Sequence, residues 1–159
     1  MSVTLDIVES WRRPRVVLRR LLGQDRSEPF ALSLLVTGLI LLFISRTPYL
    51  RREAMVMPDM PLAQLLLASA LGMAATVPFW YLLAALGHLV ARALGGKGGY
   101  YQGRIALFWA LVAASPALLT FGLVQGLTDP GTGTVAIGLV ALAAFLLFWA
   151  VMLHEAERA

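Results

Sequence analysis

Two histidines and one glutamate are the side chains of this chain best suited to ligate a metal or carry a proton. His88 follows the second of four long apolar runs, and His154 and Glu155 follow the fourth. If the runs cross a membrane, all three residues reach the same side of it, where they would form a metal or proton-sensing cluster. The alternative is that both histidines simply face water. A zinc-protease motif is excluded, because Arg158 stands where its second histidine is required.

Residues 95–99, with the sequence Gly-Gly-Lys-Gly-Gly, invite comparison with a phosphate-binding loop. The comparison fails, because Ala91 replaces the first glycine of that motif and Gly98 replaces its Ser or Thr. We interpret the segment as a flexible turn. There is no cysteine to form a disulfide or ligate a metal, and no nucleophile, base and acid stand in a recognisable pattern. The sequence therefore predicts a protein that is not an enzyme and needs no cofactor.

Four apolar runs, at residues 29–44, 62–86, 105–127 and 132–153, contain no charged side chain. About 20 helical residues match a hydrocarbon core of about 30 Å, so each run is long enough to cross a bilayer. We predict an all-α, polytopic transmembrane bundle of four helices with a short N-terminal interfacial amphipathic helix. The expected parts are a basic cytoplasmic or interfacial head (1–28), a four-span membrane domain (29–153) and a cytoplasmic tail (154–159).

The positions of Lys and Arg predict the orientation. Ten of the 13 lie in the head, in the connection between the second and third runs, or in the tail, and three follow the first run. The positive-inside rule then places both termini in the cytoplasm. The net charge of +4 does not indicate nucleic acid here, because the arginines flank membrane spans. Anionic lipid headgroups are the partner that explains them more simply.

The head carries a short amphipathic pattern. Pro14 suits the first turn of a helix, and over residues 15–22 the apolar side chains share one face while arginines occupy the other. Such a helix is typical of the headgroup region of a membrane. The alternative is a basic topology signal with incidental amphipathicity. The residues expected to meet lipid are Trp11, Arg12, Arg13, Arg15, Arg19 and Arg20.

Pro78 and Pro116 lie within the second and third runs, at matched depth near mid-bilayer. Each removes a backbone hydrogen bond and is expected to kink its helix. The kinks either improve packing or form a hinge or cavity between these two spans. The absence of charge within the runs argues against ion-coupled transport, since charged residues inside membrane helices usually mark ion pathways.

Small residues recur four apart in the apolar runs. Ala68, Gly72 and Thr76 form one row, and Gly138 belongs to another. Such rows let helices approach closely in lipid, so we expect them to pack the spans against each other or against other membrane-protein subunits. The connection over residues 46–60, with Pro48 and Pro58, is expected to be irregular.

Residues 90–103, with the sequence Val-Ala-Arg-Ala-Leu-Gly-Gly-Lys-Gly-Gly-Tyr-Tyr-Gln-Gly, lead into an apolar stretch that reaches Pro116. This segment resembles the bacterial branch of the YIP family, the Ypt/Rab-interacting-protein membrane domain. The basic, proline-containing head over residues 11–22 is similar as well. The resemblance implies a helical protein of the bacterial inner membrane that works through contacts and has no catalytic residues. Members often have five spans, whereas this length holds four, and the long acidic head and tyrosine-containing motifs of eukaryotic members are missing here. Binding of small GTPases is therefore not carried over.

These observations favour a non-enzymatic scaffold or accessory subunit that acts through helix packing and lipid contacts. A small transporter or lipid-handling protein, built on the kinked second and third spans, is the alternative. A membrane-embedded enzyme with a site at the inner interface is a third, weaker hypothesis.

Overall fold

The computed structural model describes residues 2–57 and 59–158. The first residue of the expected head, the last residue of the expected tail, and Pro58 lie outside these ranges. The described residues form eight helices: α1 (Val3–Ser10), α2 (Pro14–Leu22), α3 (Glu28–Val56), α4 (Leu62–Ala75), α5 (Val77–Ala93), α6 (Tyr100–Ala113), α7 (Ser115–Leu127) and α8 (Thr132–Ala156).

Three of these segments are long and apolar enough to cross a membrane. They are α3, the nearly continuous pair α4–α5, and α8. A fourth is obtained when α6 and α7, which are bent by 45° at their junction, count as one span. The architecture is therefore all-helical, with three to four candidate membrane spans. Each of the four apolar runs falls within one candidate span or within the bent pair α6–α7.

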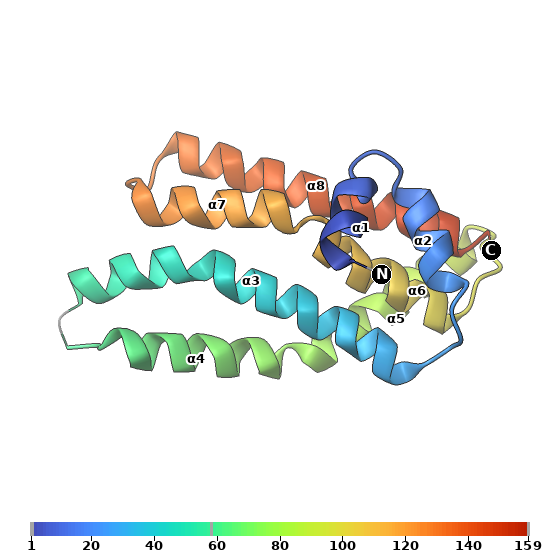
Figure 1. The fold of residues 1–159 in the computed structure, drawn as a ribbon, viewed down its shortest axis with the longest axis horizontal. Helices are drawn as coiled ribbons and strands as arrows, with labels where there is room; N and C mark the ends of the chain where they lie inside the picture. The colour runs from blue at the N-terminus through green and yellow to red at the C-terminus, as the bar shows by residue number, and fades with distance from the viewer. Residues whose placement is uncertain (1, 58, 159) are drawn as a thin grey trace.

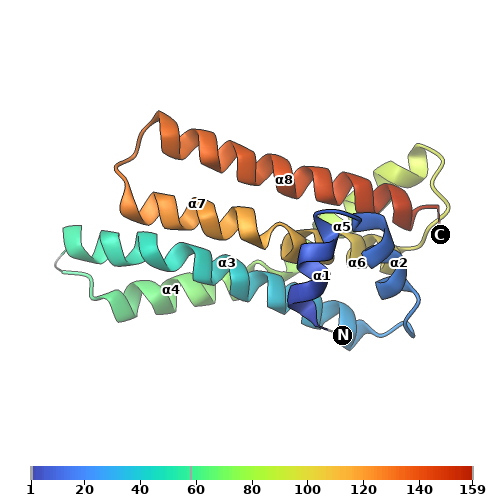
Figure 2. The ribbon, with the colours of Figure 1, turned by 45° about the horizontal axis from the view of Figure 1, so that its top comes forward.

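The spans pair as two antiparallel hairpins, α3–α4 and α7–α8 (Figure 1). Helix α3 contacts both α4 and α7 and lies between them. Both chain ends lie in the same half of the molecule, while the α3–α4 and α7–α8 connections lie at the opposite end (Figures 1 and 2). Termini on the same side are what an even number of crossings requires.

Both breaks occur at the predicted prolines. Helix α5 begins at Val77 and α7 at Ser115, so that Pro78 and Pro116 each occupy the second position of the new helix. A proline is tolerated there, because its missing N–H is one that a first turn leaves unpaired anyway. Each kinked run is thus two helices joined at one residue.

The connection over residues 46–60 is mostly helical, and the prediction of an irregular loop was wrong. Helix α3 continues to Val56 with Pro48 inside it. This part of α3 packs on α7 where Gly122 faces the backbone of Ser45 and Gly126 faces Pro48. A side chain on either glycine would collide with α3, so the close contact that supports the longer helix depends on their small size.

Helix α6 is the centre of the fold. Every side chain from residue 105 to residue 114 is buried, and α1, α2, α3, α5 and α8 all contact α6. The apolar face of α2 contributes to this cover, since Val17, Leu18 and Leu21 are at most 4% exposed and lie against α6 and α8. The expectation that this face rests on lipid was therefore wrong: it packs on protein.

The two small-residue rows have different outcomes. A side chain at Gly138 would come within 2.9 Å of the Phe121 ring, so this glycine lies in the α7–α8 contact. In contrast, Ala68 and Gly72 are exposed, and no atom lies within 4 Å of a Cβ placed on Gly72. Within the described residues, the row that includes Thr76 does not pack the spans of this chain together at Gly72, and its contact with another membrane-protein subunit stays a prediction.

We predict opposite effects of the same substitution at two glycines. Gly122→Ala should lower stability by about 1–3 kcal/mol, because the new methyl group overlaps the backbone of Ser45. Gly72→Ala should leave stability unchanged or raise it by up to about 1 kcal/mol, since alanine favours the helix and meets nothing. Thermal unfolding in a mild detergent measures both. Equal midpoints for the two variants would contradict the α3–α7 packing described here.

Candidate functional site

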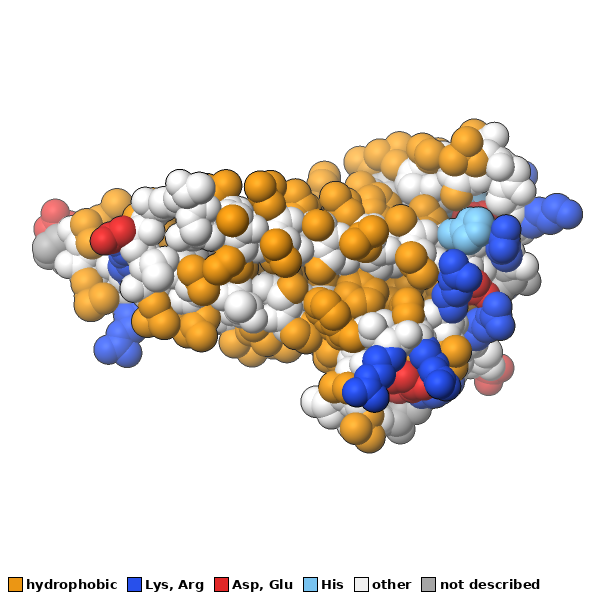
Figure 3. Space-filling model, turned by 90° about the horizontal axis from the view of Figure 1, so that it is seen from above, with side chains coloured by type: hydrophobic (Ala, Val, Ile, Leu, Met, Phe, Trp, Pro, Cys, Tyr) orange, Lys and Arg blue, Asp and Glu red, His pale blue; other side chains and the backbone are white. Residues whose placement is uncertain are grey.

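Charged side chains gather at the two ends of the molecule, and hydrophobic ones cover the length between them (Figure 3). At the end that carries the termini, the head, the 95–99 turn and the tail come together. We call this region the polar end. At the opposite end, Arg52 contacts the carbonyl of Thr128 and pairs with the Asp129 carboxylate, which joins α3 to the α7–α8 connection.

The deepest polar contact of the polar end joins His88 to Glu157. The His88 Nδ1 lies 2.6 Å from the Glu157 Oε1, and the two side chains are 1% and 4% exposed. The Gly98 N–H donates to the other carboxylate oxygen at 3.0 Å, and the Lys97 N–H donates to the Glu157 carbonyl at 2.9 Å. The tail is thereby attached to both α5 and the glycine-rich turn.

This contact explains the glycines of the 95–99 turn. Gly95 has a φ of +96°, a conformation that other residues rarely adopt. A Cβ on Gly96 would lie 2.5 Å from the Glu157 carboxylate, and one on Gly98 would lie 2.6 Å from the carbonyl of Ala156. The turn therefore needs glycine in order to wrap closely around the tail, and not in order to bind phosphate.

The predicted cluster of His88, His154 and Glu155 does not form. His154 is exposed, and Glu155 points to α2, where its carboxylate lies 2.5 Å from the Arg19 Nε and 4.0 Å from the Arg15 Nε. Among the described residues, no three His, Cys, Asp or Glu side chains are placed to hold a metal ion. Consecutive residues of a helix point about 100° apart, so the tail directs its acids to different partners.

The His88 Nε2 is buried and has no hydrogen-bond partner among the described residues. The His88 ring packs against the Tyr100 ring, with 4.4 Å between their centroids. Sequence reasoning missed Glu157 as the partner of His88, because the contact depends on how α5 and the residue that follows α8 meet in space.

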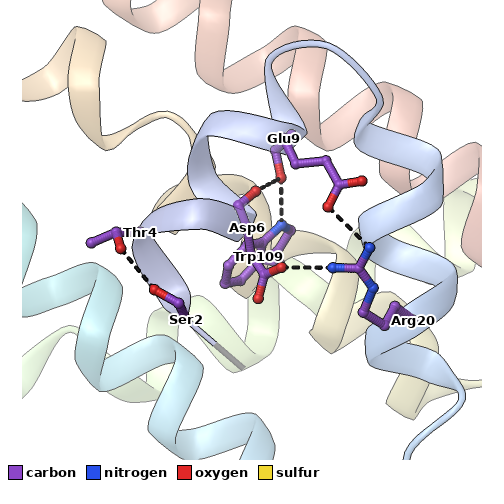
Figure 4. A network of polar contacts seen from close by, with 7 residues as sticks. Ser2, Thr4, Asp6, Glu9, Arg20 and Trp109 are labelled. Carbon is purple, nitrogen blue, oxygen red and sulfur yellow. Dashed lines mark hydrogen bonds and ion pairs between the residues drawn. The ribbon is translucent and has the colours of Figure 1, made fainter.

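The head is attached to α6 by a network of polar contacts (Figure 4). The Trp109 Nε1 donates to the Ser10 hydroxyl at 3.0 Å, and that hydroxyl donates to the carbonyl of Asp6 at 2.7 Å. The Arg20 guanidinium pairs with Asp6 at 2.8 Å and with Glu9 at 3.0 Å, which joins α1 to α2. Trp109 itself is only 1% exposed.

Trp11 lies at the break between α6 and α7. Its Nε1 donates to the carbonyl of Ala113 at 2.9 Å, and its ring meets Phe148 edge-on at 5.1 Å. The Ala117 N–H donates to Ala114, which leaves the Ala113 carbonyl able to accept from Trp11. Trp11 thus supplies a hydrogen bond to the Ala113 carbonyl at the break in the span. This contact with protein differs from the lipid contact expected for Trp11.

Another ion pair joins the starts of two spans. The Arg104 guanidinium lies 2.7 Å from the Glu28 carboxylate and 5.7 Å from the centre of the Tyr81 ring. Of the five head arginines expected to meet lipid, three pair with acids of this chain: Arg15, Arg19 and Arg20. Arg12 and Arg13 are exposed and pair with no acid among the described residues.

We predict that Glu157→Ala loosens the polar end. Removing the carboxylate leaves His88 and the Gly98 N–H without their partner, at a cost of about 3 kcal/mol. Trypsin should then cut after Lys97 faster by about tenfold, because the turn separates from the tail. The control is Asp59→Ala, which removes an exposed carboxylate from the α3–α4 connection. Unchanged cleavage after Lys97 in the Glu157 variant would show that the tail does not retain the turn.

Comparison with known proteins and protein families gives one match, to a family model that covers most of the chain. Neither the curated proteins nor the solved structures that were searched gave a match. The family model described as Yip1 domain matches residues 8–158, which include the head, all the candidate spans and the polar end. The chain therefore belongs to the Yip1 domain family.

Proposed function

We propose that this protein is a non-enzymatic scaffold or accessory subunit of a membrane assembly, which acts through helix packing and lipid contacts. The observation that supports this proposal best is the exposure of α4. None of its residues is buried, and its main neighbour is α3. Its outer surface includes Ala68 and Gly72, which leave room for the backbone of another helix.

The physical basis is the way helices associate in lipid. Lipid tails are as apolar as leucine, so association depends on close van der Waals contact, which small residues permit. Other glycines of the spans, among them Gly122, Gly126 and Gly138, already make close contacts within the chain. The α4 row is free, so a transmembrane helix of another subunit is the partner that its shape fits.

The polar end also supports a structural role. Its acids, Asp6, Glu155 and Glu157, are buried and pair with basic groups of the same chain or with a backbone N–H. Such pairs join segments to one another, whereas a catalytic site needs groups that are free to meet a substrate.

The transporter alternative receives less support from the geometry. Helix α3 lies between α4 and α7, the parts of the two kinked spans between which the transporter alternative requires a cavity. The hollow of about 270 Å³ beside the first break is lined only by apolar side chains, among them Met73 and Val77. An apolar hollow of this kind fits a lipid chain better than a hydrated ion.

The test of the scaffold is a substitution that the fold tolerates. Gly72→Leu should keep the thermal stability of the purified protein, because Gly72 contacts nothing in this chain. It should reduce partner proteins that co-purify in a mild detergent by about tenfold, since the larger side chain keeps a partner helix away.

The matched control is Gly133→Leu on α8, where the glycine is also free of contacts. Partner proteins are identified and quantified by mass spectrometry in wild type and both variants. If the Gly72 variant recovers the same partners in the same amounts as the Gly133 variant, α4 faces lipid alone and the scaffold proposal is wrong.

We propose a bacterial inner membrane as the location, with both termini in the cytoplasm. Reporter fusions after Lys97 and at the C-terminus should give cytoplasmic signals, and fusions near Glu53 and Asp129 should give signals from the opposite side. The reason is the ten-to-three distribution of Lys and Arg. A C-terminal fusion that reports from the outside would reverse the orientation.

A further inference from the structure

One edge of the head combines exposed apolar and unpaired basic side chains. Leu5 and Val8 on α1 are 70% and 60% exposed. Together with Glu9, Arg12 and Arg13 they line a hollow of about 400 Å³. We call Leu5, Val8, Arg12 and Arg13 the α1 edge.

The charge of this edge is not balanced within the described part of the chain. Glu9, the acid that lines the hollow, already pairs with Arg20 at 3.0 Å. Arg12 and Arg13 pair with no acid among the described residues. The two guanidinium groups therefore present a net positive charge beside two exposed aliphatic side chains.

The position of the head places this edge beside the bilayer. Trp11 reaches Ala113, which lies nine residues further along α6 than Arg104 (113 − 104 = 9). At 1.5 Å per residue, Ala113 is about 13 Å deeper than Arg104, whose partner Glu28 starts a span. The head forms a lobe that projects sideways from the bundle near its polar end (Figure 3). Its outer edge therefore faces the bilayer below the headgroups, and the long arginine side chains of the edge extend toward the phosphates.

We propose that the α1 edge binds an anionic phospholipid. Arg12 and Arg13 donate to the headgroup phosphate, for which the guanidinium geometry is suited, while Leu5 and Val8 contact the first part of the acyl chains. This inference rests on the lipid contacts of the proposed function and assigns them to α1 and the α1–α2 connection.

The first test measures lipid retention by the full-length protein in nanodiscs made from equal amounts of phosphatidylglycerol and phosphatidylcholine. After extraction, native mass spectrometry reports which lipid stays bound. The double variant Arg12→Gln, Arg13→Gln should lose selectivity for phosphatidylglycerol by roughly thirtyfold, because each basic residue contributes about 1 kcal/mol near an anionic surface.

The matched control is Arg46→Gln, Arg51→Gln, which removes two exposed arginines near the opposite end of α3. This control should keep the wild-type selectivity. Equal retention of phosphatidylglycerol by wild type and the Arg12, Arg13 variant would overturn the proposal. An equal loss in both double variants would also overturn it, since the attraction would then be that of net charge and not of a site.

A second measurement does not depend on the arginine variants. The chain has no cysteine, so Val8→Cys and Asp25→Cys each accept a single fluorophore. Lipids brominated along their chains should quench the label at residue 8 at least threefold more than the label at residue 25, an exposed position in the α2–α3 connection. Equal quenching at the two positions would show that the α1 edge does not enter the bilayer.

The experiments test the lipid site and the scaffold independently. Selectivity for phosphatidylglycerol is measured with the Arg12, Arg13 variant, and recovery of partner proteins is measured with the Gly72→Leu variant of α4. Unchanged phosphatidylglycerol retention with reduced partner recovery in the Gly72→Leu variant would remove the lipid site and leave the scaffold. The reverse result would remove the scaffold and leave the lipid site.

Discussion

The burial of α6 is the constraint on which the rest of this structure depends. A helix that is apolar on every side can be covered either by lipid or by protein, and here five other helices cover it. Two of the five belong to the basic head, so the head is part of the packed structure and not an appendage. The side chain of Trp109 on α6 attaches the head by its hydrogen bond to Ser10 of α1.

The bilayer explains why the polar contacts are placed where they are. Inside hydrocarbon an unpaired backbone group is costly, so the carbonyl left open at the α6–α7 break accepts a hydrogen bond from Trp11. Charged groups lie at the two ends, where pairs such as Arg104 with Glu28 meet water on one side and protein on the other. The buried pair of His88 with Glu157 is protected by the glycine-rich turn that surrounds it.

Three surfaces of the molecule therefore differ in character. The polar end is internally paired, α4 exposes small residues to the bilayer, and the α1 edge presents unpaired arginines beside aliphatic side chains. The segments of the polar end are joined by ion pairs and hydrogen bonds, whereas α4 and the α1 edge leave apolar side chains exposed. This is the arrangement that a membrane scaffold needs, because its contacts must face outward.

The sequence by itself determined the apolar spans, the breaks at Pro78 and Pro116, and the short helix that begins at Pro14, because periodicity and proline chemistry act locally. Only the tertiary structure decided which apolar faces meet protein. In a membrane both lipid-facing and buried surfaces are apolar, so spacing could not separate the free row at Gly72 from the packed contact at Gly138. The choice of Glu157 over Glu155 as the partner of His88 likewise depends on how α5 and α8 meet in space, which no local pattern encodes.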